Sequence, residues 1–191
     1  MTRVYLARHG VTDFNDQGRY LGRSDVSLNE LGRKQAEETK DRISKFNIDI
    51  VISSPLKRAI ETANIIKPSD LEILSESAFI ERSVGVYEGL TKDEAKGKYP
   101  ELFARNVTRI FNEAPTNGET ILDAQNRVFT ALYIIGKVYI GKDVLIVTHA
   151  FVAKVVNKYF NQNLSEQEFF DFILQPSEVK EYTFEKEGDF K

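Results

Sequence analysis

The sequence predicts an α/β fold, a three-layer sandwich with a mostly parallel central sheet and helices on both faces. Strand-like and helix-like segments alternate along the 191 residues, as expected when crossover helices join parallel strands. The most strand-like segments, such as 144–147, are continuous apolar runs, which indicates strands buried on both faces. No repeat, low-complexity tract or linker divides the chain, so we expect one domain over 1–191.

Apolar runs with β-branched or aromatic residues mark the strands, which we expect at 4–7, 48–52, 71–74 and 144–147, with an edge strand at 180–184. Segments rich in Gly, Asp, Asn and Ser predict loops at 10–27 and 78–90. Helices are expected at 30–46, 56–66, 119–139 and 150–160.

Capping signals support several of these helices. Asn29 precedes the first, in which Leu31, Ala36, Ile43 and Phe46 share one face. The caps and the proline of Ser53-Ser54-Pro55 precede the second helix. Thr91 and Glu94 form a capping box for a short helix, and Pro100 and Pro115 bracket another.

Composition excludes several classes of protein. The chain has no cysteine, which excludes disulfides, thiolate nucleophiles and cysteine-bound zinc. Its net charge of −3 does not suggest a nucleic-acid partner. There is no signal-peptide pattern at the start and no apolar run of membrane-spanning length, so we expect a cytoplasmic protein without a membrane partner.

The only two histidines, His9 and His149, each follow a buried-strand pattern directly. Ligands of open α/β sheets bind beyond the carboxyl ends of the strands, so both imidazoles are expected at one sheet edge. Arg8 and Arg58 can approach the same edge, and guanidinium groups bind phosphate in a bidentate way. Each residue alone could be structural, but together the four predict an oxyanion pocket. A metal site is the alternative, and it lacks a third ligand at a recognisable spacing.

Five motifs in order resemble the histidine phosphatase superfamily, which includes the cofactor-dependent phosphoglycerate mutases. The resemblance spans Arg3 to about Phe160. Its motifs are Leu6-Ala7-Arg8-His9-Gly10-Val11-Thr12 with Asn15 and Gly22; Ser53-Ser54-Pro55-Leu56-Lys57-Arg58-Ala59 with Thr62-Ala63; Glu81 with Gly85 and Glu88-Gly89; Gly118-Glu119-Thr120; and Val147-Thr148-His149-Ala150.

The resemblance implies a phosphatase of the histidine acid phosphatase type, phosphoglycerate mutase-like, with no metal and no cofactor. His9 would be the nucleophile and Glu81 the acid that protonates the leaving oxygen. The remaining residues would bind a small phosphorylated substrate: Arg8, Arg58 and His149 the phosphoryl oxygens, with Asn15, Gly22 and the backbone N–H of Ala150. From spacing alone, Glu76 and Glu88 remain alternatives to Glu81. Leu21 replaces a polar residue of the family and is left out of the site.

Two other functions remain open. A mutase is suggested by Glu81-Arg82 and by Lys92, which could bind a substrate carboxylate. The mutases are longer, however, and carry adjacent arginines where this chain reads Arg105-Asn106-Val107. A phosphate-binding module without turnover is the second alternative. Residues 91–117 are expected to form a helical cap, whose basic residues either face solvent or select a second anionic group: Lys92, Lys96, Lys98, Arg105 and Arg109. The sequence predicts neither which phosphorylated compound is the substrate nor the oligomeric state.

Overall fold

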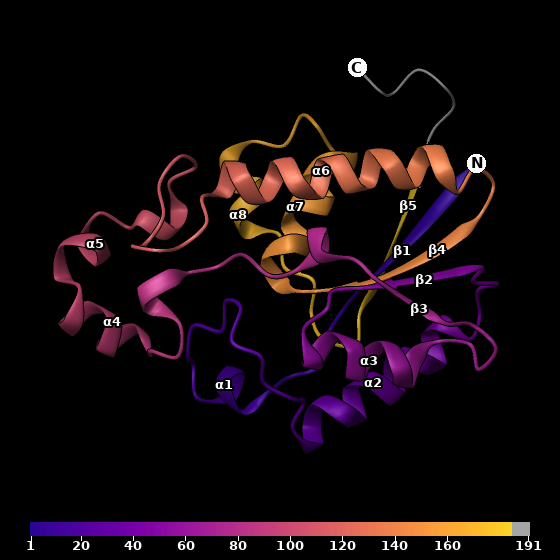
Figure 1. The fold of residues 1–191 in the computed structure, drawn as a ribbon, viewed down its shortest axis with the longest axis horizontal. Coiled ribbons are helices and arrows are strands. Elements are labelled where there is room, and N and C mark those ends of the chain that lie inside the picture. Colours follow the sequence, from indigo (N-terminus) through magenta and orange to yellow (C-terminus); the bar gives the residue numbers. More distant parts are fainter. Residues whose placement is uncertain (185–191) are drawn as a thin grey trace.

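A five-stranded sheet forms the centre of the computed structural model, which describes residues 1–184 (Figure 1). The strand order is β3-β2-β4-β1-β5. The first four strands pair in parallel and β5 pairs antiparallel with β1 at the sheet edge, which confirms the predicted sheet and its edge strand. The strands are β1 (Thr2–Arg8), β2 (Ile50–Ser53), β3 (Ile73–Ser75), β4 (Asp143–Thr148) and β5 (Val179–Phe184).

Each face of the sheet is covered by helices, because alternate residues of the central strands are apolar in both directions. Val4, Leu6 and Ile146 belong to the core beneath α6 (Ile121–Val138) and α7 (Ala150–Phe160). Tyr5 and Leu145 belong to the core beneath α2 (Glu30–Ile43) and α3 (Lys57–Ile66). All five side chains are at most 1% exposed, and burying each stabilises the fold by about 1.5–3 kcal/mol. The three-layer prediction is therefore confirmed.

The four long helices lie where the sequence predicts them, with differences at their ends and faces. Asn29 caps α2 by accepting a hydrogen bond from the N–H of Gly32 at 2.9 Å. Leu31, expected on the buried face, is 51% exposed instead, because the helix buries Gly32 and Ala36, with Gly32 against the backbone of Val11. The predicted caps of α3 are also wrong. Its N-cap is Leu56, which makes no side-chain cap.

Short elements inside the predicted loops were missed by periodicity, because each holds only one or two turns. The expected loop 10–27 contains α1 (Asp13–Asp16), and η1 (Ser77–Phe79) and η2 (Gly85–Tyr87) flank Glu81. Helix α8 (Glu166–Asp171) was not predicted, although Ser165 and Glu168 form a capping box before and within it. These turns matter because two of them shape the segment that carries Glu81.

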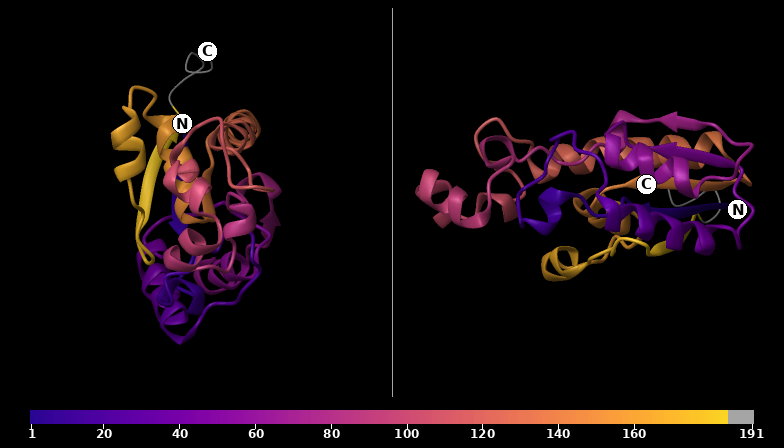
Figure 2. Two further views of the ribbon diagram at one scale, coloured as in Figure 1. Left: turned by 90° about the vertical axis from the view of Figure 1, so that its left-hand side faces the viewer. Right: turned by 90° about the horizontal axis from the view of Figure 1, so that it is seen from below.

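The segment 91–117 holds α4 (Lys92–Lys98), α5 (Pro100–Ala104) and η3 (Val107–Arg109), and the capping box of Thr91 and Glu94 forms as predicted. Helices α4 and α5 lie at one end of the molecule, away from the amino terminus, in Figure 1 and in the right-hand view of Figure 2. The five basic residues of this segment are all exposed. A single domain over 1–191 stays a prediction, since residues 185–191 lie outside the described part.

Candidate active site

The carboxyl ends of three neighbouring parallel strands place Ser54, His149 and His9 side by side. In the register of β1 with β4, Arg8 pairs with Thr148, so the residue after each strand is a histidine. The N–H of His9 donates to the carbonyl of Thr148 at 3.0 Å, and the N–H of Ser54 donates to the carbonyl of Val147 at 3.0 Å. The two imidazole centroids are 5.0 Å apart. Both histidines therefore meet at one sheet edge, as the sequence predicts.

His9 is held as a neutral imidazole with a defined tautomer. Its Nδ1 lies 2.6 Å from the carbonyl oxygen of Gly10, which can only accept, so we assign the proton to Nδ1. Its Nε2 then accepts from the Nε of Arg58 at 3.2 Å. Burial, and then the nearby Arg58 and Arg8, lower the pKa of His9 well below 6.5. The unprotonated nitrogen required of a nucleophile is thus Nε2.

Arg58 is a fully buried cation that organises the loop following His9. Its terminal nitrogens donate to the carbonyls of Ser24 at 2.7 Å and of Gly22 at 2.9 Å. Burial is the main reason why the pKa of Arg58 is lowered from 12.5 to about 10. Asp25, from the same loop, caps α3 by accepting from the N–H of Lys57 at 2.7 Å. The loop after β1 therefore supplies the cap that Ser53 and Ser54 were predicted to provide.

His149 lies next to His9 but is not among the residues that line the open pocket. Its Nε2 is 2.6 Å from the Oγ of Ser54, and its buried Nδ1 has no hydrogen-bond partner among the described residues. Burial and then Arg58 lower the pKa of His149 well below 6.5. Arg8 also has an unpaired buried nitrogen, Nε, while its Nη1 donates to the carbonyl of Leu174 at 3.2 Å. Unsatisfied buried polar atoms at one site are typical of functional positions.

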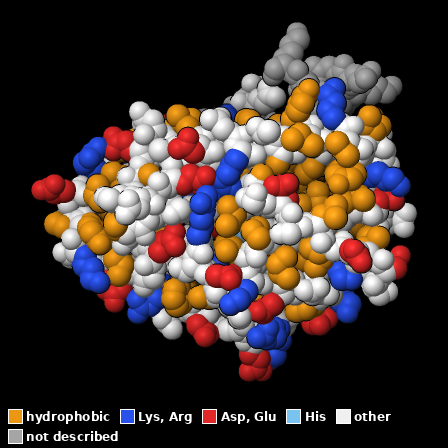
Figure 3. Space-filling view, viewed as in Figure 1, with side chains coloured by type: hydrophobic (Ala, Val, Ile, Leu, Met, Phe, Trp, Pro, Cys, Tyr) orange, Lys and Arg blue, Asp and Glu red, His pale blue; other side chains and the backbone are white. Residues whose placement is uncertain are grey.

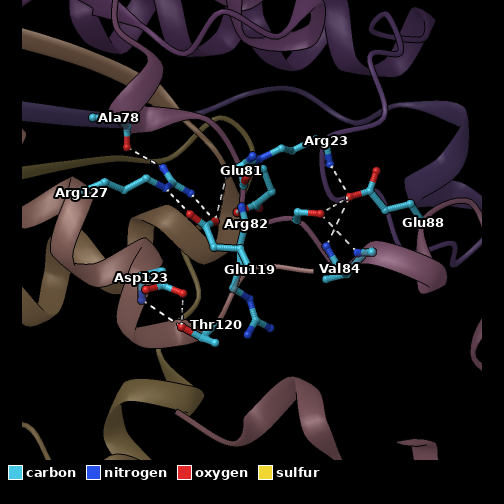
Figure 4. A network of polar contacts seen from close by, with 12 residues as sticks. Arg23, Ala78, Glu81, Arg82, Val84, Glu88, Glu119, Thr120, Asp123 and Arg127 are labelled. Carbon is cyan, nitrogen blue, oxygen red and sulfur yellow. Dashed lines mark hydrogen bonds and ion pairs between the residues drawn. The ribbon is translucent and has the colours of Figure 1, made fainter. Parts of the chain in front are cut away.

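Glu81 faces the same pocket from the loop between η1 and η2. Its Oε1 accepts from the N–H of Arg82 at 2.8 Å, and its Oε2 accepts from the N–H of Phe151 at 3.1 Å, in the first turn of α7. Glu88 does not line the pocket. Its Oε1 accepts from the N–H groups of Arg23 and Val84 and from the Oγ of Ser83, so it holds the loop together (Figure 4).

The pocket has a volume of about 230 Å³. Seven of the eight predicted site residues line it: Arg8, His9, Asn15, Gly22, Arg58, Glu81 and Ala150. Asn15 uses its Oδ1 to accept from the N–H of Thr12 at 3.0 Å, so its amide Nδ2 is the donor left for a ligand. Gly22 adopts a left-handed φ of 50°, where a Cβ would lie 2.4 Å from Glu88. No residue of 91–117 is among the lining residues.

Part of the pocket wall comes from residues outside the predicted site. Leu21, left out because it replaces a polar residue of the family, lines the pocket with an apolar side chain. The other lining residues not predicted are Arg19, Tyr20, Arg82, Val84 and Phe151. Ser54 was also missed as the partner of His149. Ser54 could have been found from its position directly after a buried strand, which it shares with both histidines.

Within residues 1–184, no group of three or more His, Cys, Asp or Glu side chains could hold a metal ion. In the same range, no helix has the length and apolar character needed to cross a membrane. On the face in Figure 3, acidic and basic side chains are interspersed. The arginines of the pocket and the imidazole of His9 suit an oxyanion such as a phosphoryl group.

Comparisons with known proteins identify the family of this chain. The family described as histidine phosphatase superfamily (branch 1) matches residues 4–190. The uncharacterized phosphatase PhoE of Bacillus subtilis is 37% identical, over 78% of this chain and 72% of its own length. Phosphoserine phosphatase 1 of Hydrogenobacter thermophilus is 35% identical, over 78% and 71%. The structure of Bacillus stearothermophilus YhfR superimposes with a TM-score of 0.89 at 29% identity, over 97% and 93%. This chain therefore belongs to the histidine phosphatase superfamily.

Proposed function

We propose that this chain is a phosphomonoester hydrolase of the histidine acid phosphatase type, which acts on a small phosphorylated metabolite through a phosphohistidine on His9. The observation that carries the proposal is the state of His9. Its Nδ1–H is bound to the carbonyl of Gly10 at 2.6 Å, and its unprotonated Nε2 is oriented by Arg58 at the edge of the pocket. We also propose that the enzyme is cytoplasmic and needs no metal ion for activity.

In the first step, the Nε2 of His9 attacks phosphorus and the bond to the leaving oxygen breaks. Glu81 gives its proton to that oxygen, so an alcohol leaves. Arg8 and Arg58 neutralise the charge on the phosphoryl oxygens, and donors fixed before the reaction supply most of the rate enhancement in phosphoryl transfer. The unpaired Nδ1 of His149 and Nε of Arg8 are further groups for these oxygens.

In the second step, water attacks the phosphorus of phospho-His9 and the bond from phosphorus to Nε2 breaks. Glu81, now ionised, takes a proton from the water, and inorganic phosphate leaves. Both roles of Glu81 are supported by its position in the lining of the same pocket as His9. Asn15 and the backbone at Ala150 line that pocket too, and we propose that they bind phosphoryl oxygens.

The experiment is a rapid quench into base with ³²P-labelled substrate, because phosphohistidine survives alkali and is labile in acid. One label is expected on the peptide that contains His9, and none in the His9→Ala variant. In the His149→Ala variant, labelling should slow without moving. A label on His149, or near-normal turnover by the His9→Ala variant, contradicts the mechanism.

A panel of phosphate esters then separates the alternatives. A phosphatase releases phosphate from p-nitrophenyl phosphate, whereas a binding module without turnover releases none. A mutase converts 3-phosphoglycerate to its isomer when 2,3-bisphosphoglycerate is present, with little phosphate release. Phosphoserine belongs in the panel, because a relative that is 35% identical carries the name phosphoserine phosphatase. Lys92 is exposed, and its binding of a substrate carboxylate stays a prediction.

A further inference from the structure

Arg23, Glu119 and Arg127 form an ion triad next to the loop between η1 and η2 that carries Glu81, which we call the acid loop. None of the three is among the residues that line the pocket. Glu119 sits between two arginines (Figure 4). Arg127 binds it through two parallel bonds, from Nε to Oε1 at 2.7 Å and from Nη2 to Oε2 at 2.9 Å. The Nη2 of Arg23 lies 3.2 Å from the same Oε2. The Glu119 side chain is 13% exposed, so its charge is largely desolvated and depends on both partners.

Each arginine of this triad also holds one backbone carbonyl of the segment that carries Glu81. The Nη1 of Arg127 donates to the carbonyl of Ala78 at 2.6 Å. The Nε of Arg23 donates to the carbonyl of Glu81 itself at 3.2 Å. The triad therefore forms hydrogen bonds to both ends of the four-residue stretch 78–81, and the carboxylate of Glu119 joins the two arginines that donate them.

Arg23 also connects the acid loop to the loop that follows β1. Arg23 stands between Gly22 and Ser24, whose carbonyls both accept hydrogen bonds from Arg58. Arg58 in turn donates to the Nε2 of His9 at 3.2 Å. The nucleophile is thus linked to the backbone of Glu81 by hydrogen bonds from Arg58 to Gly22 and Ser24, by the peptide bonds that join these residues to Arg23, and by the hydrogen bond from Arg23 to Glu81.

We propose that Glu119 is a positioning residue, which sets the distance between Glu81 and the phosphoryl group through Arg23 and Arg127. The inference rests on the proposed function, in which Glu81 transfers the proton. The Arg23 side chain is 40% exposed, and an ion pair this exposed contributes little to stability. We therefore infer that the pair acts by fixing the position of the acid loop. Proton transfer needs heavy atoms within about 2.6–3.2 Å. The hydrogen bonds that hold Arg58 go to His9, Ser24 and Gly22 and not to Glu81.

The test compares two leaving groups in the Glu119→Gln variant. Misplacement of a reacting group by about 1 Å costs on the order of 10²-fold in rate. We therefore expect kcat for an alkyl phosphate, whose alcohol must be protonated, to fall by about 10- to 100-fold with KM nearly unchanged. For p-nitrophenyl phosphate, whose leaving group needs little protonation, kcat should fall by less than about 3-fold.

Asp143→Asn is the matched control. Asp143 is 7% exposed and accepts two hydrogen bonds from Arg3, at 2.7 and 2.5 Å. Both residues lie at the amino-terminal ends of β1 and β4, at the end of the sheet away from the histidines. This substitution also removes a largely buried carboxylate from an arginine, so it should lower the melting temperature and leave the ratio of the two rates unchanged. A Glu119→Gln variant with an unchanged ratio overturns the inference.

Two further variants keep the test decisive. If Glu119→Gln does not fold, Arg23→Met answers the question, because its side chain is 40% exposed and the same selective loss is expected. Glu81→Gln is measured in parallel. A selective loss in Glu81→Gln without one in the triad variants overturns the positioning role alone. An equal loss on both esters in Glu81→Gln shows that Glu81 is not the acid, and the positioning role falls with it.

Discussion

Replacing Arg58 by methionine is expected to remove activity while the fold persists. The guanidinium has five N–H donors, and three bonds are made within the protein, to His9, Ser24 and Gly22. One N–H on each terminal nitrogen remains, and we propose that this pair binds two phosphoryl oxygens. A hydrogen bond from a charged group contributes about 1.5–3 kcal/mol, so two of them contribute about 3–6 kcal/mol in the transition state. At about 1.4 kcal/mol per tenfold, kcat/KM should fall by about 10²- to 10⁴-fold.

The stability of the Arg58→Met variant is governed by two opposing effects. Removal of the buried charge relieves a desolvation that holds the pKa of Arg58 at about 10 instead of 12.5, which corresponds to about 3 kcal/mol. Against this, three acceptors lose their donor, namely the carbonyls of Gly22 and Ser24 and the Nε2 of His9, at about 1–3 kcal/mol each. The net loss in free energy of unfolding should therefore lie between about 0 and 6 kcal/mol.

Steady-state kinetics and urea unfolding measure the two quantities for Arg58→Met. Phosphate should raise the melting temperature of the unsubstituted protein, because a ligand that binds only the native state stabilises it. It should not raise that of the variant. A variant with kcat/KM within tenfold of the unsubstituted protein, or one that phosphate stabilises equally, would refute the assignment of Arg58 to the phosphoryl group.

Three further predictions concern pH, packing and metals. The pKa values of His9 and His149 are lowered well below 6.5, so the unfolded chain binds protons that the native state does not as the pH falls below about 6.5. Urea unfolding at pH 7.5 and 5.5 should show lower stability at pH 5.5, and constant stability contradicts the burial argument. A Cβ on Gly32 would lie 2.1 Å from the carbonyl oxygen of Val11, so Gly32→Ala should cost at least about 1–3 kcal/mol in the same assay, and a neutral change would refute this contact. Phosphatase activity should survive EDTA, and complete loss that a divalent ion restores would exclude the metal-independent mechanism.

The sequence alone determined the order of the elements and the edge of the sheet that carries the chemistry. Continuous apolar runs and capping residues are local signals, so strands such as β4 and helices such as α7 were predicted within a residue or two. The position of His9 and His149 directly after two such strands was enough to bring them together, since parallel strands end at one edge. The choice of Glu81 over Glu88 came from the family resemblance and not from local pattern.

Only the tertiary structure decided which side chains complete the site and which hold it in place. Ser54 reaches His149, Asp25 caps α3, and Arg23 joins the loop after β1 to the carbonyl of Glu81, 58 residues away in sequence. Such contacts join residues from different loops, and a loop residue has no periodicity that indicates where its side chain points. Leu31 was misplaced for a related reason: the closest packing on α2 is made by Gly32, whose lack of a side chain gives no apolar signal.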